Sequence, residues 1–182
     1  ISTKYHPELE NDVRCMANTL EHRGPDDFGF WSDSKFGISL GHKRLSIVDL
    51  SAAGHQPMFS SCGRYLIVFN GEIYNHLSLR TELNKPSVST TIKVDYIQSR
   101  WKGHSDTETL LECISEWGIE RTLKESIGMF AFALWDLKSQ TLTLARDRFG
   151  EKPLYYGWVN GNFVFGSELK ALRAFPKFNN PV

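Results

Sequence analysis

Apolar residues recur along this chain with two different spacings, and the spacing predicts where helices and strands form. Helical spacing predicts amphipathic or short helices over residues 8–20, 77–83 and 167–175. Short apolar or alternating runs bounded by turn residues predict strands. The predicted strands cover residues 28–31, 38–45, 65–69, 129–135, 142–145, 154–156 and 162–165.

A helix-capping pattern predicts one more helix in the middle of the chain. Ser105 can accept a hydrogen bond from the amide of Glu108, while Glu108 reaches back to the amide of Ser105. An apolar stripe from Leu110 to Trp117 follows, and Gly118 is a typical helix stop. Residues 84–103 show no sustained period, which predicts a long surface loop with a short strand around residues 92–97.

The order of these elements indicates the fold class. Strand runs are bracketed by helices rather than alternating with them, which favours an α+β fold with antiparallel sheet over a doubly wound parallel sheet. The length of 182 residues suits one domain, and no repeat or low-complexity segment divides it.

Charge and composition exclude several classes of function. Lys plus Arg number 21 and Asp plus Glu number 21, so no basic excess exists to hold a nucleic-acid backbone. The longest apolar runs are too short to span a bilayer, and we expect no membrane association. Cys15, Cys62 and Cys113 form an odd, sparse set, which is typical of a reducing cytoplasm rather than of a disulfide scaffold.

Polar clusters follow several of the predicted strands, where sites commonly form. No CxxC pair, HExxH motif or phosphate-binding glycine loop is present, and the scattered histidines predict no metal site. Taken singly, each cluster has an ordinary structural interpretation. Arg44 can be a surface charge, Asn70-Gly71 a hairpin turn, and Asp106 a carboxylate at a helix N-terminus.

In their order along the chain, however, these clusters resemble the class II glutamine amidotransferase domain of glutamine-hydrolysing asparagine synthetases. The resemblance covers nearly the whole chain from residue 22 onward. The matching blocks are HRGPDD at 22–27, GHKRLSIVDLSAAGHQPM at 41–58, FNGEIYNH at 69–76, SDTETLL at 105–111, GMFAFALWD at 128–136, ARDRFGEKPLYYG at 145–157 and FGSELKAL at 165–172. It implies an αββα sandwich of the N-terminal nucleophile (Ntn) hydrolases, with two antiparallel sheets between helical layers.

The resemblance also implies roles for individual residues. Arg44 would bind the α-carboxylate of glutamine, since its guanidinium matches a carboxylate bidentately. Asn70 and Gly71 would form the oxyanion hole. The remaining substrate-binding residues would be Ile47 and Val48, through their backbones, and Glu72 and Asp106, which would hold the α-ammonium group.

The implied reaction is hydrolysis of glutamine to glutamate and ammonia. A C-terminal synthetase domain of the same polypeptide would then use the ammonia for ATP-dependent amidation of aspartate. We therefore expect no cofactor in this domain, with ATP and Mg²⁺ confined to the synthetase domain. Family members often dimerise, so a homodimer is a further expectation. The acceptor, aspartate or another carboxylate, stays open, and other class II amidotransferases fit the motifs less well.

One departure from the family pattern concerns the nucleophile. In the family it is a cysteine at the mature N-terminus, at the start of a Cys-Gly-Ile-Ala-Gly-like strand, with its own α-amino group as the base. This chain begins with Ile1, and its cysteines stand in no matching motif. Either an opening strand precedes Ile1 in the native protein, or the domain is a degenerate one that binds glutamine or supports a synthetase. The intact set of site residues favours the first alternative, and we expect the 182-residue chain itself to be inactive.

Overall fold

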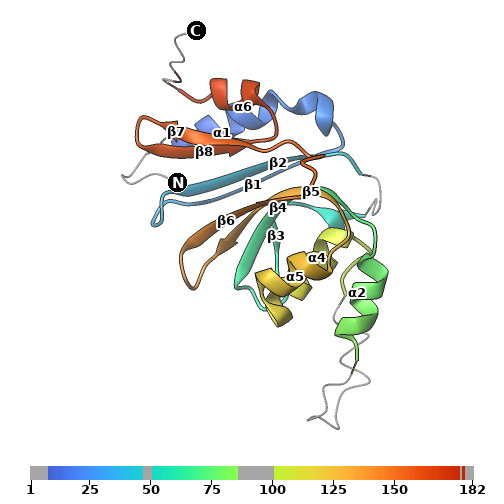
Figure 1. Cartoon of the computed structure of the whole chain (residues 1–182). Helices are drawn as coiled ribbons and strands as arrows, with labels where there is room; N and C mark the ends of the chain where they lie inside the picture. The colour runs from blue at the N-terminus through green and yellow to red at the C-terminus, as the bar shows by residue number, and fades with distance from the viewer. Residues whose placement is uncertain (1–7, 47–50, 86–100, 177, 179–182) are drawn as a thin grey trace.

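A four-stranded antiparallel sheet lies at the centre of the computed structural model, which describes residues 8–46, 51–85, 101–176 and 178. Its strands follow the order β3 (Met58–Phe59), β4 (Tyr65–Ile73), β5 (Gly128–Asp136) and β6 (Thr141–Arg146). Two antiparallel two-stranded ribbons, β1 (Asp27–Asp33) with β2 (Ile38–Arg44) and β7 (Tyr155–Val159) with β8 (Asn162–Gly166), lie beside one face of this sheet (Figure 1).

Helices cover the two outer sides of the strands. Helices α1 (Leu9–Asn18) and α6 (Leu169–Arg173) lie on the side of the ribbons, at the top of Figure 1. Helices α2 (His76–Leu83), α4 (Asp106–Trp117) and α5 (Ile119–Glu125) lie below the four-stranded sheet. Short 3₁₀ turns occur at Glu21–Arg23 and Ala52–Gly54. The predicted α+β class with antiparallel strands is confirmed. No helix among the described residues is both long and apolar enough to cross a bilayer.

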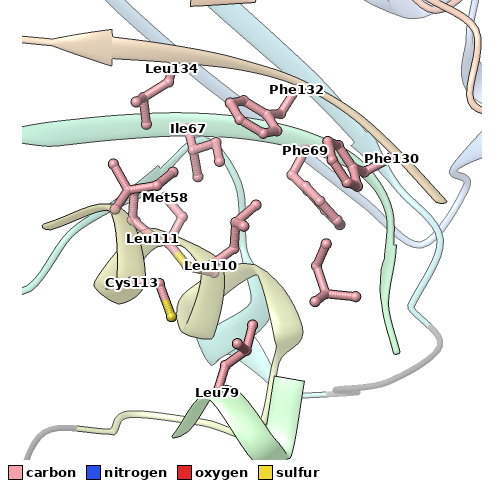
Figure 2. Close-up of a cluster of buried hydrophobic side chains, with 12 residues drawn as sticks. Met58, Ile67, Phe69, Leu79, Leu110, Leu111, Cys113, Phe130, Phe132 and Leu134 are labelled. Carbon is pink, nitrogen blue, oxygen red and sulfur yellow. The ribbon is translucent and has the colours of Figure 1, made fainter. Parts of the chain in front are cut away.

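Successive side chains of β4 and β5 point alternately to the two faces of the central sheet, so these strands contribute to a hydrophobic cluster on each face. Ile67 and Phe69 of β4, with Phe130 and Phe132 of β5, point toward the helices, where they contact Leu110 and its neighbours on α4 (Figure 2). The intervening residues face the ribbons and form a second cluster with β2. That cluster contains Ile38, Leu40, Leu66, Val68, Ala133 and Trp135. Successive side chains of a strand point to opposite faces, so an almost continuous apolar run here indicates a strand buried on both sides.

Most predicted helices and strands are present, although their first or last residues differ from the prediction. The difference at the end of β4 affects the position of two candidate site residues. The strand predicted over residues 65–69 continues to Ile73, so Asn70 and Gly71 lie inside β4, paired with Ala131 and Phe130 of β5, and do not form a hairpin turn. Long-range pairing with β5 overrides the local turn preference of Asn-Gly. The helix α5 and the short strand β3 were not predicted. The strand expected at 92–97 lies outside the described residues.

One half of the predicted capping box of α4 is present, and the Glu108 carboxylate is bound by other donors than the Ser105 amide. The Ser105 hydroxyl accepts a hydrogen bond from the Glu108 amide at 3.0 Å. The Glu108 carboxylate accepts from the amides of Lys102 and Gly103 and from the guanidinium of Arg80. These contacts fix the N-terminal turn of α4, which carries Asp106.

The core beneath the central sheet allows a direct test of the packing. Leu110→Ala should lower the free energy of unfolding by about 2–5 kcal/mol, because Leu110 is fully buried and truncation leaves a cavity. Leu77→Ala on α2 is the matched control, since Leu77 is 67% exposed and its loss should change stability by less than about 0.5 kcal/mol. Urea denaturation measures both. Equal effects in the two variants would contradict the described core.

Candidate functional site

A cavity of about 480 Å³ lies where the ribbons, the central sheet and the N-terminus of α4 meet. Arg44, Asn70, Gly71 and Asp106 all line it, although they are separated by up to sixty-odd positions in the sequence. Glu72, the next residue of β4, is not among its lining residues. Ile47 and Val48 lie outside the described residues. The structure thus brings together most of the predicted residues that it describes, and leaves Glu72 beside the cavity.

Arg44 ends β2 and has 9% of its surface exposed. Its Nη1 donates to the carbonyl of Ser51 at 3.0 Å. Gly54 makes room for the guanidinium, since a Cβ at Gly54 would stand 1.9 Å from Nη2 of Arg44. A guanidinium carries five N–H donors in a fixed planar arrangement, and these neighbours set the orientation of that plane.

The HRGPDD segment has a structural role in holding Arg44. Pro25 forms a bridge with Arg44, whose carbonyl accepts from the Asp26 amide at 3.0 Å. The Asp26 carboxylate then accepts from the amide of Ser46 at 2.8 Å. A Cβ at Gly24 would come within 2.4 Å of the Lys43 carbonyl, so only glycine permits this close approach.

The main chain of Gly71 faces away from β5. Phe130, its partner on β5, directs both its backbone groups to Asp147: its carbonyl accepts from the Asp147 amide and its amide donates to the Asp147 carboxylate. Gly71 and Phe130 therefore form a non-hydrogen-bonded pair of the antiparallel ladder. In such a pair both residues direct their N–H and C=O groups away from the partner strand. The Gly71 N–H therefore belongs to the outer edge of β4, on the side of the cavity.

Side chains complete this outer edge of β4, because β3 pairs only with Leu66 and Ile67. The amide of Phe69 donates to Oε1 of Gln56 at 2.6 Å, and Nε2 of His42 lies 3.0 Å from the carbonyl of Phe69. The amide of Ile73 donates to the Asp106 carboxylate at 2.8 Å. Gly71 lies midway between these anchored residues, so its N–H is held in place by neighbours on both sides.

Asn70 adds a second donor next to that of Gly71. Its Nδ2 is buried and has no hydrogen-bond partner in the described part of the chain. Buried polar atoms are nearly always paired, so an unpaired buried amide nitrogen at a cavity indicates a group that awaits a ligand. An Nδ2 and a backbone N–H side by side are the donors from which oxyanion holes are built.

Asp106 is the first helical residue of α4 and is 5% exposed. Burial raises the pKa of its carboxyl group, while hydrogen bonds from the amides of Ile73 and Thr107 oppose that rise. The two oxygens accept these amides at 2.8 and 2.9 Å. A carboxylate offers about four lone-pair positions, so Asp106 retains capacity for a cationic group of a ligand.

Gln56, Thr107 and His42 also line the cavity and were not predicted as site residues. Gln56 joins the two functional segments, because its Oε1 accepts from Phe69 while its Nε2 donates to Thr107 at 3.4 Å. Their only indication in the sequence is their place inside the matching blocks. Gln56 precedes Pro57, Thr107 follows Asp106, and His42 stands two residues before Arg44.

His42 is held in its neutral form by burial, which lowers its pKa to about 4. The hydrogen bond to the Phe69 carbonyl works against this shift, and the positive charge of Arg44 reinforces it. Since a carbonyl only accepts, Nε2 carries the proton, and Nδ1 is left as a buried acceptor without a partner in the described residues.

None of the three cysteines lines the cavity. Cys15 and Cys62 are exposed, Cys113 is buried, and none of the three forms a disulfide. Within the described ranges no group of three or more His, Cys, Asp or Glu side chains has the arrangement of a metal site.

The environment of His42 predicts a dependence of stability on pH. The unfolded chain takes up a proton on His42 near its ordinary pKa of 6.5, whereas the folded chain does so only near pH 4. Stability is therefore lost as the pH falls from 6.5 toward 4, by up to roughly 3 kcal/mol from this group. His42→Gln keeps an N–H donor without titrating, so urea denaturation at pH 7, 6 and 5 should show a shallower decline. Identical slopes in the two proteins would contradict a buried neutral His42.

Comparison with known proteins agrees with this arrangement of residues. Residues 1–182 match the family model of the glutamine amidotransferase domain. The chain is 35% identical over 187 residues to "Putative asparagine synthetase [glutamine-hydrolyzing] 2" of Methanocaldococcus jannaschii, covering 94% of this chain and 33% of that protein. It is 41% identical over 168 residues to "Asparagine synthetase [glutamine-hydrolyzing] 3" of Bacillus subtilis, covering 88% and 24%.

A second Bacillus subtilis relative, "Asparagine synthetase [glutamine-hydrolyzing] 2", is 37% identical over 164 residues, covering 90% of this chain and 20% of that protein. The chain thus spans between a fifth and a third of the length of these curated relatives. Because the family match extends over the whole chain and the predicted residues converge on one cavity, this chain belongs to the glutamine amidotransferase domain family.

Proposed function

We propose that this domain binds glutamine and is the glutaminase part of an asparagine-synthetase-like enzyme. The observation that carries the proposal is the meeting of Arg44, Asn70, Gly71 and Asp106 at one cavity, with the Asn70 amide nitrogen unpaired. A cation, a pair of neutral donors and an anion match the α-carboxylate, the side-chain carbonyl and the α-ammonium group of glutamine.

In the proposed reaction a cysteine thiolate attacks the side-chain carbonyl carbon of glutamine. The carbonyl oxygen becomes an oxyanion, which accepts hydrogen bonds from Nδ2 of Asn70 and the N–H of Gly71. Collapse of this intermediate breaks the C–N bond, and the nitrogen leaves as ammonia with a proton from the α-ammonium group of the cysteine. Water then hydrolyses the thioester to glutamate and regenerates the thiol.

The nucleophile in this proposal is a cysteine at the start of a segment that precedes Ile1 in the native polypeptide. The argument is one of position, because Cys15, Cys62 and Cys113 all lie away from the cavity. By the same argument the 182-residue chain alone binds glutamine without hydrolysing it.

The proposal extends to the rest of the enzyme. A C-terminal synthetase domain would consume the ammonia in an ATP- and Mg²⁺-dependent amidation of aspartate, and this domain would need no cofactor of its own. The relatives' names and the additional length of those relatives support this arrangement. We further place the domain in the αββα Ntn-hydrolase class and in the cytoplasm. The layers of Figure 1 support the first of these.

A non-catalytic domain that only binds glutamine or supports a synthetase is the second candidate. The absence of a thiol among the described residues that line the cavity favours it. The two candidates differ in one observable, which is glutamate release by the native full-length protein.

The binding half of the proposal predicts a specific effect of Arg44. Isothermal titration calorimetry should detect glutamine binding to the 182-residue chain. Arg44→Ala should weaken that binding at least about tenfold, since a hydrogen bond to a charged group contributes about 1.5–3 kcal/mol. Arg14→Ala is the matched control, because Arg14 lies on α1 outside the cavity and pairs with Glu10. Equal affinities in Arg44→Ala and the unmodified chain would exclude this site.

The catalytic half is tested in the native full-length polypeptide, after its first residue has been identified by mass spectrometry. If that residue is cysteine, Asn70→Ala should lower kcat for glutamate release by about 100- to 1000-fold, with a much smaller change in KM. Asn75→Ala is the control, because the Asn75 side chain bonds to the backbone of Glu125 and Ile127 outside the cavity. A first residue without a nucleophile, or unchanged kcat in Asn70→Ala, would support the non-catalytic candidate.

A further inference from the structure

Gln56 is a buried polar residue that lines the cavity and has no part in the proposed reaction. Its surface is only 6% exposed. Its backbone lies directly against β1, because a Cβ at Gly29 would stand 1.6 Å from the Gln56 carbonyl oxygen. Two residues further along the chain β3 begins at Met58. The side chain of Gln56 therefore extends from a backbone that β1 contacts closely and β3 continues.

The side-chain amide of Gln56 contacts two segments of the site. Its Oε1 accepts from the amide of Phe69 at 2.6 Å, and its Nε2 donates to the hydroxyl of Thr107 at 3.4 Å. Phe69 directly precedes Asn70, and Thr107 directly follows Asp106. A primary amide carries one acceptor and one donor group at a fixed separation. One side chain thus joins a neighbour of the proposed oxyanion hole to a neighbour of the Asp106 carboxylate.

Further hydrogen bonds lead from Thr107 back to β4. The Asp106 carboxylate accepts from the amide of Thr107 at 2.9 Å and from the amide of Ile73 at 2.8 Å. Four hydrogen bonds in all therefore connect two positions of β4 that lie on either side of Asn70-Gly71-Glu72. We call this set of contacts the edge ring. Its members are Phe69, Gln56, Thr107, Asp106 and Ile73.

No strand can take over the contact that Gln56 makes in the described part of the chain. β3 is the outer neighbour of β4 there, and it pairs only with Leu66 and Ile67. All members of the edge ring are buried. A buried N–H group without a partner is costly, so removal of the Gln56 amide forces the backbone at Phe69 to move toward another acceptor.

We propose that Gln56 is a positioning residue for glutamine hydrolysis, which holds the oxyanion-hole segment of β4 at a fixed place relative to Asp106. The side-chain carbonyl and the α-ammonium group lie at opposite ends of one glutamine molecule, so the groups that bind them must keep a matching separation. A displacement of about 1 Å can cost about 100-fold in rate. Gln56 acts here through Asn70 and Gly71 and does not touch the reacting atoms.

The catalytic consequence rests on the proposed function, whereas the support of β4 by Gln56 rests on the contacts alone. Two measurements therefore test the two parts separately. Both use Gln56→Met, which keeps the length of the side chain and removes its hydrogen-bonding groups. The matched control is Thr122→Val, because Thr122 is fully buried on α5 outside the cavity and donates its hydroxyl to the Gly118 carbonyl at 2.8 Å.

The first measurement is amide hydrogen exchange of the 182-residue chain, followed by NMR. The amide of Leu134, which lies within β5, serves as the internal reference for changes in overall stability. Relative to that amide, Gln56→Met should accelerate exchange of the Phe69 amide by about tenfold, since its hydrogen bond is lost. The Ile73 amide should exchange at least about threefold faster, since the edge ring is opened. Thr122→Val should change neither ratio.

The second measurement is glutamate release by the native full-length polypeptide. Gln56→Met should lower kcat by roughly 10- to 100-fold, while Thr122→Val leaves kcat unchanged. In an Asn70→Ala background, Gln56→Met should lower kcat by a factor at least about three times smaller, because one of the groups that it positions is gone. A residue that only stabilises the fold would not show this dependence on Asn70.

Several outcomes would overturn the role of Gln56. They are an unchanged exchange ratio at Phe69 or at Ile73, an unchanged kcat of Gln56→Met in a protein that releases glutamate, or equal effects of Gln56→Met with and without Asn70. Failure of the unmodified full-length protein to release glutamate counts against the proposed function instead. In that case the exchange ratios still decide whether Gln56 holds the edge of β4.

Discussion

The pairing of β4 with β5 is the interaction on which the other parts of this structure depend. It runs without a break from Tyr65 opposite Asp136 to Ile73 opposite Gly128. Both strands are covered on two faces, so a slip of one residue would exchange the side chains that face α4 with those that face the ribbons. That register is therefore strongly specified, and it sets the positions of Asn70 and Gly71.

Glycine at position 71 is required by this pairing as well as by any ligand. A Cβ there would stand 2.2 Å from the Met129 carbonyl oxygen and 2.6 Å from Cα of Phe130. The same residue that lets the two strands approach thus leaves its own N–H on the outer edge. The close approach of β4 to β5 requires glycine at position 71, and the proposed oxyanion hole uses the N–H of the same residue.

The outer edge of β4 can take part in a binding site because β3 pairs with only two of its residues, Leu66 and Ile67. A longer β3 would cover the backbone of Phe69, Gly71 and Ile73 with strand hydrogen bonds, but β3 ends at Phe59. Gln56, His42 and Asp106 instead bind the backbone of Phe69 and Ile73 individually, and Asn70 and Gly71 between them line the cavity.

The amino-acid sequence was enough to predict the α+β class, most helices and strands, and the membership of the family, because these depend on local periodicity and on the order of the motifs. It placed Arg44, Asn70, Gly71 and Asp106 among the candidates, and all of them line one cavity. Their proposed roles depend on the resemblance and stay predictions. Three features required the three-dimensional structure. Asn70 and Gly71 continue β4, Gln56 and His42 bind the outer edge of that strand, and Glu72 lies beside the cavity. These features arise from contacts between residues distant in the sequence, such as β4 with β5 and Gln56 with Thr107, whose energies override local turn preference and leave no periodic pattern in the chain.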